Sequence, residues 1–198
     1  MSQQLGDQIK YRRRRILLAG ASVTLASITG CLGGGAVSEA DTPAVAALAE
    51  DATCDVCGMT ISQHPGSTAQ IFYADHSPDG HANPARFDTT WEAYQYEFKH
   101  DDQGWEETAF YVTDYSSVDY SISTESSDTF ISRHTKKGAF ALVADVTYVV
   151  GSAVKGAMGK DLFAFTAQKD AETFQSDHGG DLTTHDEITP EVVADLST

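Results

Sequence analysis

Sulfur-bearing side chains gather in one six-residue stretch of this 198-residue chain. It reads Cys54-Asp55-Val56-Cys57-Gly58-Met59 and so places two thiols and one thioether close together. Two cysteines separated by two residues can turn both sulfurs toward one ion, and the glycine lets the backbone curl around it. Thiolate and thioether ligands together favour Cu(I) among the common metals. A soft-metal site is therefore the first hypothesis for this stretch.

The same cysteines also fit other chemistry. Zinc would need about two further nitrogen or sulfur ligands, and the chain has no second cysteine pair. Cys54 and Cys57 could instead form a disulfide or a thiol–disulfide exchange centre, with Met59 as core filling. An exchange centre of thioredoxin type opens a helix, whereas Thr60-Ile61-Ser62 follows here, which is poor helix material. Metal binding, a disulfide and redox catalysis all stay open at this point.

Two further groups of side chains are candidate ligands. Met158 lies among small residues in Gly156-Ala157-Met158-Gly159, which is an unusual setting for a core methionine. It could line the same site or be a remnant of an internal repeat. The histidines are dispersed without helical i, i+4 metal spacing, so we expect most of them at the surface. His64 is close enough to Met59 to complete a coordination shell. The seven are His64, His76, His81, His100, His134, His178 and His185.

Signatures of hydrolysis and phosphoryl transfer are missing from the sequence. There is no glycine-rich phosphate loop, no nucleophile elbow and no paired-carboxylate pattern. Asp88 and Asp114 stand at the ends of apolar runs, where turn or cap roles suffice. We therefore expect a binding protein and no enzyme.

Alternation and turn residues predict the elements that must position these side chains. Thr89 or Thr90 would cap the first helix, and Gly179-Gly180 would end the second. The predicted strands cover 67–74, 108–115, 140–150 and 162–166, the helices cover 90–99, 169–177 and 189–196, and 116–128 reads as a loop or weak edge strand.

The order of these elements looks repeated within the chain. Residues 57–115 and 157–187 each run from a Met-containing motif through a strand and a helix to a further segment. This pattern predicts an α+β fold of two small, related ββα-type halves, about 51–120 and 140–190, that pack together.

The N-terminal region has the features of an export signal. Four arginines, Arg12 to Arg15, precede 15 apolar residues, fewer than the ~20 of a spanning helix. The arrangement resembles a twin-arginine signal over residues 1–30, and Ile28-Thr29-Gly30-Cys31 resembles a lipobox with Cys31 as the lipidated residue. An uncleaved anchor is the alternative, and both place the domain outside the cytoplasmic membrane. Residues 31–50 read as a flexible tether before a domain at 51–198.

Net charge and chain length limit the class of protein and the number of domains. The chain has 29 acidic and 13 basic residues, a net charge of −16. Five bases and one acid fall in residues 1–30, which leaves −20 for the remainder. Such an excess excludes a basic nucleic-acid footprint and fits either a high-salt host or a plain solvated surface. The length predicts one domain, or two small ones at most.

Several of these features together resemble the NosL family. They are the 54–59 stretch, Phe87-Asp88 before a helix, the 111–115 strand and the block from 150 to 180. The resemblance covers about residues 52–188, with Ala157 where the family often has Pro before Met-Gly. It implies a lipid-anchored accessory protein of nitrous oxide reductase that acts as a Cu(I) chaperone and has two related halves.

From the residues and the resemblance together we expect an exported, lipid-tethered Cu(I) chaperone. Its ligands would come from Cys54, Cys57, Met59 and Met158, and few ligands at an exposed loop would permit exchange. The expected partners are apo nitrous oxide reductase, an ABC-type maturation transporter and the membrane, without nucleic acid. The alternatives are a thiol–disulfide reductase acting on metal-site cysteines and a structural lipoprotein with a Cys54–Cys57 disulfide.

Overall fold

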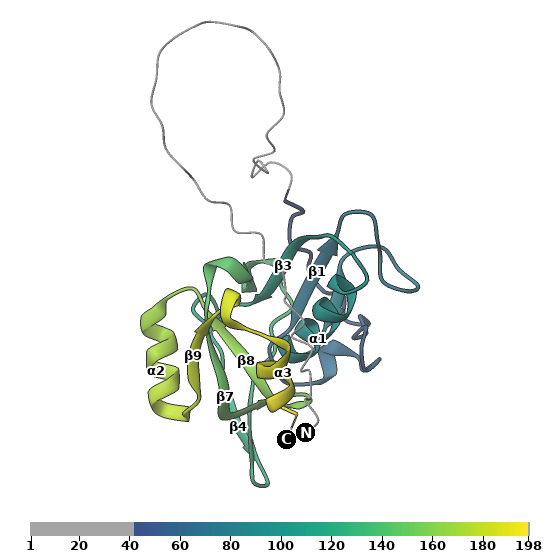
Figure 1. The fold of residues 1–198 in the computed structure, drawn as a ribbon. Coiled ribbons are helices and arrows are strands. Elements are labelled where there is room, and N and C mark those ends of the chain that lie inside the picture. The colour runs from purple at the N-terminus through teal and green to yellow at the C-terminus, as the bar shows by residue number, and fades with distance from the viewer. Residues whose placement is uncertain (1–41, 198) are drawn as a thin grey trace, which may run out of the picture. The chain divides into compact units, whose positions relative to one another are not determined.

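The first sheet carries the elements that surround the cysteine pair. The computed structural model describes residues 42–197, so the expected signal, Cys31 and the first part of the tether lie outside it. This antiparallel sheet has the order β2-β1-β3-β6, and its strands β1 and β3 are labelled in Figure 1. Its strands are β1 (Ala69–Tyr73), β2 (Ala85–Phe87), β3 (Glu107–Thr113) and β6 (Phe140–Leu142). Helix α1 (Thr90–Asp101) follows β2 directly.

The second sheet follows the order β4-β5-β7-β8, and β9 also pairs with β7. Only the β5–β7 pair is parallel among its pairings. The strands are β4 (Ile122–Glu125), β5 (Asp128–Ile131), β7 (Thr147–Gly156), β8 (Gly159–Phe165) and β9 (Asp181–Thr184). Helix α2 (Gln168–His178) follows β8 and packs Phe174 against Phe163 and Phe165, and α3 (Pro190–Asp195) comes last.

Strand β8 belongs to both hydrophobic cores. Leu162 and Ala164 are buried in the core that α1 covers, whereas Phe163 and Phe165 are buried in the core that α2 covers. Successive side chains of a strand point to opposite faces, so an apolar run such as 162–165 fits a strand covered on both sides. The Tyr115 N–H donates to the Ala164 carbonyl at 2.8 Å and links the end of β3 to this strand.

The α+β class is confirmed, and several element predictions need revision. The strand predicted over 140–150 is two strands, β6 and β7, because a 3-10 turn at Val143–Asp145 interrupts it. Strands β2, β5 and β9 were not predicted, and β4 lies in the stretch 116–128 that was read as a loop or weak edge strand. The internal duplication and the domain boundaries stay predictions.

The segment before residue 50 is attached to the domain in the structure. The carbonyl of Pro43 accepts a bond from Tyr111, Ala46 exchanges two bonds with the Gln70 side chain, and Leu48 is buried. These contacts fix the last part of the expected tether against the first sheet.

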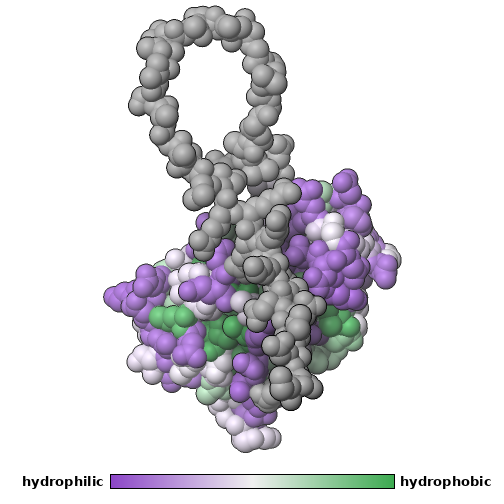
Figure 2. All heavy atoms as spheres, in the orientation of Figure 1, coloured by the Kyte–Doolittle hydropathy of each residue, from purple (hydrophilic) through white to green (hydrophobic). Residues whose placement is uncertain are grey.

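The surface of the domain is largely polar. Hydrophilic residues cover much of the visible face in Figure 2, as the charge composition leads one to expect. Within residues 42–197, no helix combines the length and apolar character needed to cross a membrane.

Candidate metal centre

The stretch from Cys54 to Met59, called the sulfur loop below, is a tight hairpin. Thr53 and Thr60 pair as an isolated antiparallel bridge at its base. The Cys54 N–H donates to the Met59 carbonyl, and the Gly58 N–H donates back to the Cys54 carbonyl, both at 2.9 Å. Gly58 has φ +74°, which glycine adopts without a steric penalty. The predicted role of this glycine in curling the backbone matches what is seen.

Two carboxylates lie against the two thiols. One donor atom from each of Cys54, Cys57, Asp88 and Glu92 falls within 4.8 Å of the others. The Cys54 thiol donates to Glu92 Oε2 at 3.4 Å, and the Cys57 sulfur lies 3.7 and 3.8 Å from the Asp88 oxygens. Cys54 is buried and Cys57 is exposed, and both are free thiols. We call these four side chains the mixed centre.

The start of α1 explains how the carboxylates reach the thiols. Thr89 caps the helix: its hydroxyl accepts from the Glu92 N–H and donates to Glu92 Oε2, both at 3.1 Å. Because Thr89 supplies the cap, the Asp88 side chain is free to face the sulfur loop. Asp88 and Glu92 are each 1% exposed, so both carboxyl groups are held away from solvent.

Burial and mutual repulsion keep protons on this centre. Burial raises the pKa of Cys54, and the charges of Glu92 and Asp88 raise it further, while the N–H groups of Cys57 and Asp88 oppose the shift. Burial also raises the pKa of Cys57, against the Met59 N–H. The pKa of Glu92 rises to about 8 through burial and then through its hydrogen bond with Asp88. A bound cation would displace these protons.

The two candidate methionines stand at different places. Met59 is partly buried and closes the sulfur loop, whereas Met158 is 44% exposed in the turn between β7 and β8. A methyl group placed on Gly66 would lie 3.1 Å from both the Asp88 carbonyl oxygen and the Ala157 nitrogen. The Met158 turn therefore adjoins the segment that carries Asp88. The role of Met59 and Met158 as ligands stays a prediction.

Sequence reasoning missed the two carboxylates of the mixed centre. Asp88 was given a turn or cap role, and Glu92 was read only as part of a helix. The available signal was their position, because Asp88 and Glu92 stand on either side of the expected cap residue Thr89. No histidine within residues 42–197 joins the group. With two thiols and two carboxylates, the centre also meets the ligand count of a zinc site.

An α+β protein that gathers four ionisable donors beside an exposed loop belongs to the class of candidate metal-binding proteins. The family model NosL matches residues 44–193, and the chain belongs to the NosL family. Among solved structures, it is similar to the crystal structure of the copper chaperone NosL from Shewanella denitrificans. The two are 25% identical with a TM-score of 0.57, over 76% of this chain and 98% of that one. Comparison with curated protein sequences gives no match.

Proposed function

We propose that this protein is a copper chaperone that carries Cu(I) on the sulfur loop. The observation behind the proposal is the mixed centre, in which two free thiols lie within 4.8 Å of each other and one of them is exposed. The similarity to a solved copper chaperone supports copper as the cargo. Thiolates select soft Cu(I), and Met59 and Met158 are the two thioethers within residues 42–197.

The unequal exposure of the thiols suits uptake and release. Buried Cys54 would hold the ion, while exposed Cys57 would be the point where a ligand of another protein attacks before the old bond breaks. Each thiol loses its proton when it binds the ion, and the nearby Asp88 and Glu92 oxygens are placed to accept hydrogen bonds from the thiols in the copper-free state. Proton exchange would therefore accompany every loading and unloading step.

The proposed recipient and location rest on resemblances alone. The proposed recipient is apo nitrous oxide reductase, with an ABC-type transporter in the same maturation process. The proposed location is the outer face of the cell membrane, through a lipid on Cys31, which lies outside the described residues. The support for these statements is the resemblance of the chain to its family and of residues 12–31 to a lipoprotein signal.

An anaerobic competition titration tests the cargo. The reduced protein is titrated with Cu(I) against a chromogenic chelator and separately with Zn(II). We expect one Cu(I) per chain and much weaker binding of Zn(II), with stoichiometric transfer from the loaded protein to the apo-reductase. Insulin reduction with turnover and without copper uptake would favour the thiol–disulfide reductase instead. Preference for Zn(II) would assign the mixed centre to zinc.

A further inference from the structure

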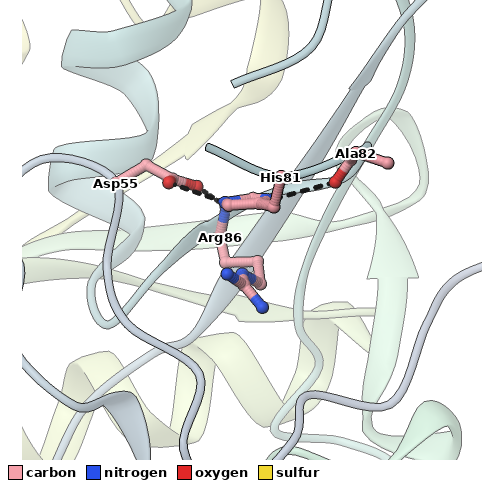
Figure 3. Close-up of polar contacts among 4 residues, drawn as sticks. All are labelled: Asp55, His81, Ala82 and Arg86. Atoms are coloured by element: carbon pink, nitrogen blue, oxygen red, sulfur yellow. Dashed lines mark hydrogen bonds and ion pairs between the residues drawn. The ribbon is translucent and has the colours of Figure 1, made fainter. Parts of the chain in front are cut away.

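Asp55, the residue that follows Cys54 in the sulfur loop, makes several hydrogen bonds to other segments. The Asp55 N–H donates to the Arg86 carbonyl at 2.9 Å, and Asp55 Oδ2 accepts from the Arg86 N–H at 2.6 Å. The other carboxylate oxygen lies 2.9 Å from His81 Nε2. Figure 3 shows the Asp55 carboxylate facing these partners, while the Arg86 guanidinium extends away from it. One side chain thus ties the sulfur loop to two other segments.

Each of these segments is itself fixed. Arg86 is the middle residue of β2 and stands two residues before Asp88, which faces Cys57. His81 belongs to the 74–84 connection between β1 and β2. Asn83 holds this connection by donating to the carbonyls of Tyr73 and His76, at 2.8 and 2.9 Å. Asp55 therefore fastens the sulfur loop to a strand and to an anchored loop.

His81 contacts an oxygen atom through each of its two ring nitrogens. His81 Nδ1 lies 2.8 Å from the Ala82 carbonyl oxygen, and its Nε2 faces the Asp55 carboxylate. With the ring held between these two oxygen atoms, the contact of Nε2 with Asp55 fixes the orientation of both side chains. The Asp55 side chain is 11% exposed, which limits screening by water.

We propose that Asp55 is a positioning residue that sets Cys54 and Cys57 opposite Asp88 and Glu92, and that His81 acts through it. The two hydrogen bonds between Asp55 and Arg86 fix where the sulfur loop lies along β2. They thereby determine which atoms of the sulfur loop face the start of α1. The expected effect on copper affinity rests on the proposed function, since a loosened sulfur loop would bind the ion less tightly. Partners of this kind, one step removed from the ligands, typically affect metal affinity by about 10- to 100-fold.

Thiol-resolved alkylation of the copper-free protein tests the loop directly. Each cysteine is followed by mass spectrometry during iodoacetamide treatment of the full chain. In the wild type we expect exposed Cys57 to react much faster than buried Cys54. Asp55→Ala and His81→Ala should raise the Cys54 rate about tenfold or more, and Asp55→Asn should recover part of the protection because its amide oxygen can accept from the Arg86 N–H. Asp75→Ala, an exposed carboxylate in the same 74–84 connection, is the matched control and should behave as wild type.

Cu(I) affinity in the same variants completes the test. Asp55→Ala should weaken binding by about 10- to 100-fold, and His81→Ala by less. The double variant should be no weaker than Asp55→Ala alone, because residues that act through one another are non-additive. Wild-type alkylation and affinity in Asp55→Ala, or additive losses in the double variant, would overturn the proposal. If Asp55→Ala does not fold, His81→Ala decides alone. A wild type that takes no copper defeats the proposed function, while the alkylation result still decides the role of Asp55.

Discussion

The N-termini of α1 and α2 both follow a strand, but they differ in their capping side chains and in the burial of their acidic residues. Each helix follows a strand, α1 after β2 and α2 after β8. At α1, Thr89 caps the helix and the buried Asp88 and Glu92 face two thiols. At α2, Ala167 offers no capping side chain, and the third residue, Asp170, is exposed. A helix that follows a strand is therefore not sufficient for a candidate metal centre. The centre at α1 also needs the thiols of the sulfur loop and the cap that Thr89 provides.

The largest expected effect is the loss of a thiolate at the α1 end. Cys57→Ser removes a charged, soft donor, and Cu(I) affinity should fall by more than about 100-fold, beyond the range of partners outside the ligand set. The measurement is the chelator competition titration. Cys31→Ser keeps all other sulfurs and should bind Cu(I) in vitro like the wild type. Unchanged affinity in Cys57→Ser would remove the sulfur loop from the copper site.

The second effect concerns how β8 holds α1. Asp161 on β8 is fully buried, and its Oδ1 accepts from the N–H groups of Trp91 and Leu162, both at 2.9 Å. Asp161→Ala leaves both donors without this acceptor and should lower the free energy of unfolding by about 2 kcal/mol. Asp161→Asn keeps an acceptor and should cost less. Urea unfolding at pH 6 measures both, and equal losses would mean that the hydrogen bonds are not the cause.

The third effect compares one methionine from each region. Met59→Leu should weaken Cu(I) binding by about tenfold while costing under about 1.5 kcal/mol of stability in the copper-free protein, because the change nearly conserves volume. Met158→Leu, in an exposed turn, should leave the melting temperature unchanged. If Met59→Leu binds as the wild type does and Met158→Leu does not, the thioether donor comes from the second region.

The fourth effect concerns how the stability of the copper-free protein depends on pH. Because burial and Asp88 raise the pKa of Glu92 to about 8, the folded state holds this proton over a pH range where the unfolded state has lost it. Stability should therefore fall as pH rises from about 4.5 to 8. Glu92→Gln should flatten part of this slope, while Asp161, whose pKa burial raises to about 7, retains another part.

Calorimetry in buffers of different ionisation enthalpy extends this test to copper. Glu92→Gln should release up to about one proton fewer than the wild type on binding Cu(I) at pH 7. Asp170→Asn, at the matching position of α2, should change neither the stability slope nor the proton count. A wild-type slope in Glu92→Gln would show that Glu92 is ionised in the copper-free centre.

The smallest effect compares the caps themselves. Thr89→Ala should cost about 1 kcal/mol of stability because the Glu92 N–H loses its acceptor. Ala167→Asp should stabilise by up to about 1 kcal/mol, since this position already has extended backbone and no capping side chain. Thermal unfolding measures both. A gain at α2 without a loss at α1 would mean that Thr89 serves the mixed centre and not the helix.

The sequence predicted the parts of the centre that are local and missed those that depend on packing. The cysteine pair, the glycine turn and the Thr89 cap depend on residues within a few positions of one another. Glu92 reaches Cys54 from 38 positions away, because Asp55 and Arg86 bring the sulfur loop to β2. Periodicity contains no information on such long-range pairing. The break between β6 and β7 was missed for a similar reason, as the alternating pattern continues through the 3-10 turn.

The sharing of β8 between two cores has a consequence for how the domain melts. With Leu162 in one core and Phe163 in the other, neither core can lose this strand without exposing the second. Residues 42–197 should therefore unfold in a single cooperative transition. Copper bound at the start of α1 would then slow the opening of amides as far away as α2, because a ligand that binds only the native state stabilises the whole cooperative unit.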